Sequence, residues 1–159
     1  PIYADKNTKK YLSKAFSYCF KNSNKEYPAI LKMNLIKDNL LIKNGKKKIK
    51  VKSVKVQHGK VDCMCYIFDK KLAYISDVSK IHKKDYRFFK KLKYLIIDCL
   101  WYKNHPSHLN LEESLELIKI FSPKKAILTN LHSELDYKIL KSILPKNIVP
   151  AYDGLKLYF

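Results

Sequence analysis

Three apolar segments of this sequence end in side chains that can bind protons or metal ions. They are residues 71–76 followed by Asp77, residues 94–97 followed by Asp98, and residues 126–129 followed by Asn130 and His132. In α/β proteins, catalytic and binding groups collect at the carboxyl ends of strands and in the loops that follow them. The pattern therefore favours a metal site over a plain hydrophobic core.

Two of the five histidines, His105 and His108, lie on a Pro-containing loop just before a predicted helix that begins at Asn110. A helix amino terminus disfavours the cationic form of a nearby imidazole, which keeps that imidazole in the titrating range. Either ring could donate a proton to a leaving oxygen. The alternative is a solvated loop histidine, and we assign no role to His82.

His58, Asp77 and His132 are too far apart in the chain to form a local motif. They can meet only if the strands that carry them lie side by side. Imidazole nitrogens with a carboxylate oxygen suit Zn²⁺ or Mn²⁺, and an aspartate can bridge two such ions.

Six short segments resemble, in order and spacing, the C-terminal half of a metallo-β-lactamase-fold hydrolase. They are Gln57-His58-Gly59, Leu72-Ala73-Tyr74-Ile75-Ser76-Asp77, Ile97-Asp98-Cys99-Leu100-Trp101-Tyr102, His105-Pro106-Ser107-His108, Ile127-Leu128-Thr129-Asn130-Leu131-His132 and Ala151-Tyr152-Asp153-Gly154. The likeness is strongest to the branch that contains phosphoribosyl cyclic phosphate phosphodiesterase, and tRNA 3′-processing ribonuclease is a more distant relative.

The resemblance implies an αββα sandwich with two divalent metal ions, Zn²⁺ or Mn²⁺, at one edge of paired sheets. It implies that His58 is a metal ligand, that Asp77 is the bridging carboxylate, and that His108 acts on the leaving group or the phosphate. Counted from His108 with the spacing that the resemblance implies, the position of the last metal ligand is Asn130, but we predict that His132 takes that role. Further residues expected to support the site are Asn130, Asp98 and His105.

The family's His-x-His-x-Asp-His cluster does not occur in these 159 residues. We therefore expect residues 1–159 to form a single domain that is the C-terminal portion of a metallo-β-lactamase-fold domain without its N-terminal metal-binding half. The predicted function is a phosphodiesterase acting on a small or cyclic phosphate ester. This chain alone would then be incomplete as an enzyme.

The elements that must position these residues follow from hydrophobic periodicity. We expect an α/β (α+β) fold with a mixed sheet covered by helices. The predicted helices are residues 8–20, 83–92, 111–121 and 135–144, and the predicted strands include residues 28–36, 61–68, 72–75, 94–97, 126–129, 148–150 and 155–159. An Asn44-Gly45 turn predicts a hairpin over residues 40–56, with Ile49, Val51 and Ser53 on its buried face.

Composition bounds the remaining possibilities. The net charge is +19, and Arg87 is the only arginine among the basic residues. Proteins that recognise specific nucleic-acid sequences rely on arginine, so we interpret the lysines mainly as solvent-exposed surface residues. The alternative function is a non-catalytic module that binds RNA or another polyanion through lysines 43–55. Four cysteines without C-x-x-C spacing, and no apolar run near 18 residues, favour reduced thiols in the cytoplasm and no membrane partner. The expected partner is a small phosphate ester, and a homodimer is left open.

Overall fold

The computed structural model describes residues 1–22 and 26–159. The chain divides into two compact units, Pro1–Leu40 and Leu41–Phe159, which are described separately. Whether the chain forms one domain, as we expect from the sequence, stays a prediction.

The first unit contains two short parallel strands and two helices. They are β1 (Ile2–Ala4), α1 (Lys6–Ala15), α2 (Ser17–Phe20) and β2 (Met33–Leu35). The carboxylate of Asp5 accepts hydrogen bonds from the Asn7 and Thr8 amides and so caps α1. The single helix predicted over residues 8–20 is wrong, because Phe16 has a non-helical backbone (φ −122°, ψ 42°) that separates α1 from α2. The strand predicted over residues 28–36 is reduced to β2.

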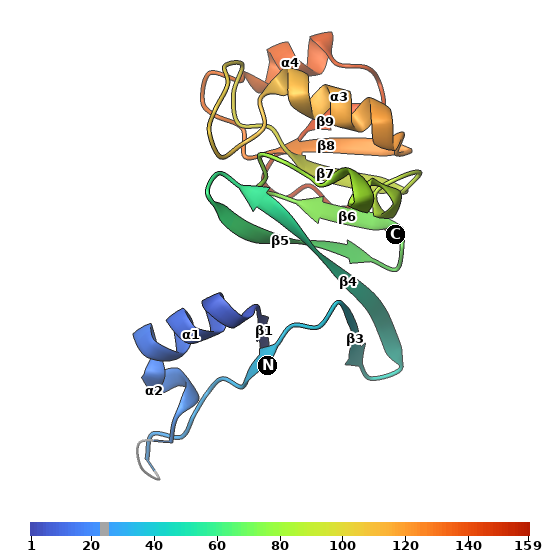
Figure 1. The fold of residues 1–159 in the computed structure, drawn as a ribbon. Helices are drawn as coiled ribbons and strands as arrows, with labels where there is room; N and C mark the ends of the chain where they lie inside the picture. Colours follow the sequence, from blue (N-terminus) through green and yellow to red (C-terminus); the bar gives the residue numbers. More distant parts are fainter. Residues whose placement is uncertain (23–25) are drawn as a thin grey trace. The chain divides into compact units, whose positions relative to one another are not determined.

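The second unit is built on a seven-stranded mixed sheet in the order β3-β4-β5-β6-β7-β8-β9 (Figure 1). Its strands are β3 (Asn39–Asn44), β4 (Lys47–His58), β5 (Val61–Phe68), β6 (Leu72–Ile75), β7 (Tyr94–Asp98), β8 (Lys125–Thr129) and β9 (Ile148–Pro150). β4, β5 and β6 pair antiparallel, whereas β6 to β9 pair parallel. The predicted mixed α/β fold is confirmed.

This topology places four strand ends at one edge of the sheet. The strand β4 runs antiparallel to β5, and β5 runs antiparallel to β6, so β4 points in the same direction as β6, β7 and β8. The carboxyl ends of β4, β6, β7 and β8 therefore share an edge, which we call the site edge. His58 is the last residue of β4 and Asp98 is the last residue of β7.

The predicted hairpin forms around Asn44 and Gly45, and Gly45 has the positive φ of 57° that such a turn requires. We call residues 39–50 the lysine hairpin. Val51 and Ser53 are buried as predicted, but Ile49 is exposed. The reason is that pairing between β4 and β5 begins at Val51 opposite Phe68, so Ile49 lies beyond the strand that would support it.

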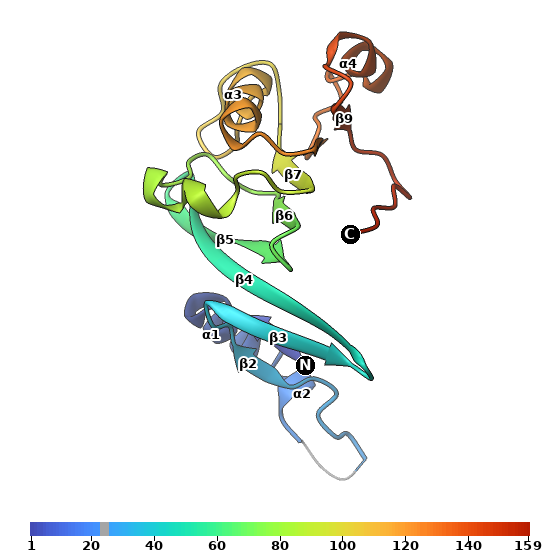
Figure 2. The same ribbon diagram turned by 90° about the vertical axis from the view of Figure 1, so that its right-hand side faces the viewer.

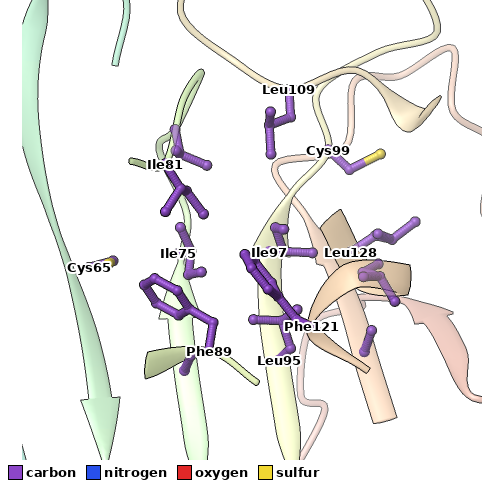
Figure 3. Close-up of a cluster of buried hydrophobic side chains, with 14 of the residues drawn as sticks. Cys65, Ile75, Ile81, Phe89, Leu95, Ile97, Cys99, Leu109, Phe121 and Leu128 are labelled. Atoms are coloured by element: carbon purple, nitrogen blue, oxygen red, sulfur yellow. The ribbon is translucent and has the colours of Figure 1, made fainter. Parts of the chain in front are cut away.

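Helices cover one face of the sheet. The segment Lys83–Phe88, predicted as part of a helix over residues 83–92, is a 3₁₀ helix, η1. The helices α3 (Leu111–Phe121) and α4 (Tyr137–Ile143) form close to the predicted positions. Phe121 of α3 packs against Phe89, and Figure 3 shows both rings near Leu95 and Ile97 of β7. This hydrophobic core holds β6, β7 and β8 in place beneath the site edge.

The C-terminal segment, residues 151–159, runs on the side of the sheet opposite α3 (Figure 2). The ring of Phe159 contacts Phe68, and the Lys93 ammonium donates a hydrogen bond to the Tyr158 carbonyl. The strand predicted over residues 155–159 does not form, because these contacts are made by side chains and not by a ladder.

The four cysteines are thiols and form no disulfide, and Cys65 and Cys99 are buried. Burial raises the pKa of both thiols to about 12. Among the described residues, no helix combines the length and the apolar composition needed to cross a bilayer.

Candidate metal centre

Three side chains converge at the site edge from separate segments. His58, Asp77 and His108 each offer one ligand atom, and these atoms lie within 4.8 Å of one another. The rings of His58 and His108 meet edge to face, with their centroids 4.6 Å apart. We call these three residues the donor group. Its members lie up to fifty residues apart in the chain, and only the sheet topology brings them together.

His58 is positioned by a tight turn and by the loop that carries His108. Its Nδ1 lies 2.7 Å from the carbonyl oxygen of Ser107, so Nδ1 carries the proton and donates it to that oxygen. The lone pair is consequently left on Nε2. The next residue, Gly59, has a φ of +61°, and a Cβ added there would lie only 3.0 Å from the Cβ of Ser107. Glycine is therefore required for the close approach of the two loops.

Asp77 is brought beside His58 because the residues that follow it pair with the end of β4. The Ser79 and Lys80 amides both donate to the Gln57 carbonyl, and the Gln57 amide donates to the Lys80 carbonyl. The hydroxyl of Ser79 also accepts a hydrogen bond from the Gly59 amide. The carboxylate of Asp77 accepts a 2.6 Å hydrogen bond from the Ser76 hydroxyl. A short bridge between segments thus sets the distance from Asp77 to His58.

His108 is positioned by the start of α3. Asn110 caps this helix, because its side-chain oxygen accepts from the Glu113 amide and the Glu113 carboxylate accepts from the Asn110 amide. The loop before the cap is closed by the Leu100 amide, which donates to the Leu109 carbonyl. The imidazole of His108 is mostly buried, with 17% of its side chain exposed.

The carboxylate of Asp98 lies beneath the donor group and is fully buried. It accepts hydrogen bonds from Nδ1 of His108 (2.8 Å), from the Val78 amide (3.1 Å) and from the side-chain nitrogen of Asn130 (3.2 Å). Burial raises the pKa of this carboxyl above its ordinary value, and the three donated hydrogen bonds oppose that rise. Because Asp98 accepts from Nδ1, the lone pair of His108 is also left on Nε2.

The structure does not bring His132 into the donor group. Its ring lies against Trp101 with centroids 5.3 Å apart, and its Nδ1 accepts a hydrogen bond from the Glu134 amide. Asn130 instead faces the site, and its side-chain nitrogen donates hydrogen bonds to the Asp98 carboxylate and to the Ser76 carbonyl. His132 therefore lies apart from His58 and Asp77 in this structure, where the turn at Asn130, with a φ of +62°, precedes the segment that contacts Trp101. The role of His132 as the last metal ligand stays a prediction.

His105 is exposed and lies next to the donor group without joining it. Its ring is 5.2 Å from that of His108, and its Nδ1 is 3.2 Å from the Ser107 hydroxyl. Sequence reasoning did not single out Gly59, Ser79 or Ser107. The signals for them are that each lies within two residues of a donor-group histidine or of Asp77, and that Gly59 and Ser107 belong to segments that carry the family resemblance.

The donor set fits a divalent transition metal. Two imidazoles and one carboxylate form a combination that binds Zn²⁺, Mn²⁺ or Fe²⁺ and leaves coordination positions open. Metal-binding histidines characteristically donate their second ring N–H to a carboxylate or a backbone carbonyl. His108 does so to Asp98, and His58 does so to the Ser107 carbonyl. Both Nε2 atoms are therefore available as ligands.

The family model and two solved structures agree on the kind of fold. The family model for the beta-lactamase superfamily domain matches residues 1–130. The solved structure of a diphosphatase from the PhnP family is 28% identical, with a TM-score of 0.85, and the match covers 99% of this chain and 57% of that one. Zn²⁺-bound PqqB from Methylobacterium extorquens is 13% identical, with a TM-score of 0.70, and the match covers 99% of this chain and 64% of that one.

A curated relative, an octanoyltransferase from Porphyromonas gingivalis (strain ATCC BAA-308 / W83), is 25% identical over 158 residues, which are 98% of this chain and 31% of the relative. The chain therefore spans less than two thirds of the length of each of these proteins.

Proposed function

The chain belongs to the beta-lactamase superfamily domain family, and on that premise we propose that the protein is a metal-dependent hydrolase of small or cyclic phosphate esters. The observation that carries the proposal is the convergence of His58, Asp77 and His108 within 4.8 Å at the site edge. The 28% identity to a diphosphatase favours phosphate compounds among the substrates that this fold accepts.

In this proposal Nε2 of His58 and the carboxylate of Asp77 hold a divalent cation, Zn²⁺ or Mn²⁺. When bound, the cation would act as a Lewis acid on phosphoryl oxygens and would lower the pKa of a water molecule beside it. Asp77 would also help to hold a second ion, whose other ligands the resemblance places in the His-x-His-x-Asp-His segment. The second ion stays a prediction.

His108 has a different role in the reaction. Its Nδ1 proton is held by Asp98, so Nε2 faces the donor group and is free to carry a second proton. We propose that this nitrogen protonates the departing alkoxide or binds the phosphate. The net charge of +19 favours anionic substrates without selecting one of them.

The test is phosphodiesterase activity of the full-length protein on bis(p-nitrophenyl) phosphate and on a cyclic ribose phosphate, with and without chelator. We expect chelation to abolish turnover and Zn²⁺ or Mn²⁺ to restore it. Asp77→Ala should abolish activity as well. The matched control is Asp62→Ala, which removes an exposed carboxylate paired with Lys55 and should change activity by less than about twofold. Activity that survives both chelation and Asp77→Ala would refute the proposal.

A second candidate function rests on the lysine hairpin. Lys43, Lys46, Lys47, Lys48 and Lys50 are all exposed there. Such a surface can bind RNA or another polyanion through phosphate contacts, and this binding weakens steeply with added salt. In a binding assay with single-stranded RNA, replacement of Lys46, Lys47 and Lys48 by Ser would reduce both the affinity and its salt dependence. Chelator and His108→Ala would have no effect on that binding.

A further inference from the structure

The buried carboxylate of Asp98 joins three segments of the site edge. It accepts hydrogen bonds from the residue that follows Asp77, from the ring of His108 and from the amide of Asn130. The metal binding proposed above uses neither Asp98 nor Asn130, and the role proposed for His108 uses Asp98 only as the acceptor of the Nδ1 proton. Burying a carboxylate is unfavourable unless donors compensate for the lost water, and here three donors do so.

The orientation of the Asn130 amide follows from its neighbours. Its two contacts are the Ser76 carbonyl oxygen and the Asp98 carboxylate, and both can only accept hydrogen bonds. The nitrogen must therefore face them and donate one proton to each. A protonated amide nitrogen is not a metal ligand. At the position where the family resemblance expects a metal-binding histidine, this chain thus has a hydrogen-bond donor.

Asp77 lies between two tethered neighbours. The carbonyl of Ser76 accepts from Asn130, and the amide of Val78 donates to Asp98. The same Asp98 oxygen that accepts from Val78 also accepts from Nδ1 of His108. The Asp98 carboxylate and the Asn130 side-chain amide therefore fix the position of Asp77, and the same carboxylate fixes the tautomer of His108.

We propose that Asp98 and Asn130 act as a positioning pair that orients Asp77 toward the metal and fixes the Nδ1–H tautomer of His108, so that Nε2 of His108 faces the donor group. The inference deepens the proposed function and rests on it for the presence of a metal. Neither residue contacts the metal or the substrate. The competing interpretation is that Asn130 is itself a ligand through its side-chain oxygen and that Asp98 serves only to stabilise the fold.

The first measurement is the tautomer of His108, read from long-range ¹H–¹⁵N correlations of the full-length protein labelled with ¹⁵N-histidine, at a pH where the ring is neutral. We expect the Nδ1–H tautomer in the wild-type protein and its loss in Asp98→Asn, whereas the exposed control Asp62→Asn keeps it. An Nε2–H tautomer in the wild-type protein overturns the proposal, whether or not any variant folds.

The second measurement is the affinity for Zn²⁺ alone, obtained by competition with a chromophoric chelator. Asn130→Asp separates the two interpretations, because an added carboxylate strengthens binding at a ligand position but repels Asp98 at a donor position. A positioning role predicts that Asn130→Asp and Asn130→Ala each weaken Zn²⁺ binding by about 10- to 100-fold. The exposed control Asn147→Ala leaves the affinity unchanged.

Tighter binding in Asn130→Asp, or unchanged binding in Asn130→Ala, would overturn the positioning role. Both readouts are independent of turnover. A protein that shows the predicted tautomer and affinities but cleaves no phosphate ester would refute the hydrolase proposal and leave the positioning pair standing.

Discussion

The site edge and the lysine hairpin belong to the same sheet but use polar side chains in opposite ways. At the site edge, Asp98 is fully buried and every donor it meets comes from another segment. In the lysine hairpin the side chains of Lys46, Lys47 and Lys48 are exposed. The hairpin contributes five exposed positive charges to the net charge of +19, whereas the site edge holds side chains whose protons and directions are fixed by hydrogen bonds. Catalysis requires the arrangement found at the site edge.

The largest expected difference between the two regions is in catalysis. His108→Ala should lower kcat/KM of the full-length protein by about 100- to 10,000-fold, because it removes the predicted proton donor. Replacement of Lys46, Lys47 and Lys48 by Ser should change kcat/KM by less than about threefold at physiological salt, where exposed charges are screened. A larger loss of kcat/KM in the triple lysine variant than in His108→Ala would show that the hairpin, and not His108, is needed for phosphodiesterase activity.

Stability should separate the regions next. Ile97→Ala removes a fully buried side chain next to Asp98 and should cost about 2 to 5 kcal/mol of unfolding free energy. Ile49→Ala is the matched change in the hairpin, where the side chain is 37% exposed, and should cost less than about 0.5 kcal/mol. Urea denaturation of both variants tests this difference, and equal costs would show that the hairpin is packed in solution.

The two turn glycines give a smaller contrast. Both have a positive φ, so alanine at either position costs about 1 to 2 kcal/mol for the backbone alone. Gly45→Ala meets no atom within 4 Å, whereas Gly59→Ala meets the Cβ of Ser107 at 3.0 Å. We expect Gly59→Ala to be the more destabilising and to weaken Zn²⁺ binding, because it displaces the carbonyl that orients His58. Equal effects on Zn²⁺ binding would exclude this role for Ser107.

The smallest expected effect on the native protein is its labelling at Cys99 by iodoacetamide. Its pKa of about 12 means that about one thiol in ten thousand is ionised at pH 8, so labelling of the native protein should be very slow. Unfolding lowers the pKa, so labelling should accelerate in urea. By the same linkage, Cys99 contributes stability that is present below pH 9 and lost as the pH rises toward 12. Fast native labelling, read by mass spectrometry, would show that the segment directly after β7 opens.

Much of the fold follows from local patterns in the sequence. The amphipathic stripe and the Asn110 cap predict α3, the apolar run predicts β7, and Asn44-Gly45 predicts the hairpin turn. The local elements that were predicted wrongly are those in which packing decided the outcome. Residues 155–159 have the composition of a strand but contact the sheet through side chains. Ile49 has the right period but lies beyond the part of β4 that pairs with β5.

The sequence by itself identified His58, Asp77, Asp98 and His108 as strand-end or loop groups, because each follows an apolar run or precedes a helix cap. Only the tertiary structure decided which of them meet, since that depends on the direction of β4 and on the bridge between residues 57 and 80. It also decided that Asn130, and not His132, faces Asp98. Two positions in sequence separate these residues, but a single backbone angle at Asn130 turns one side chain toward Asp98 and carries the other to Trp101.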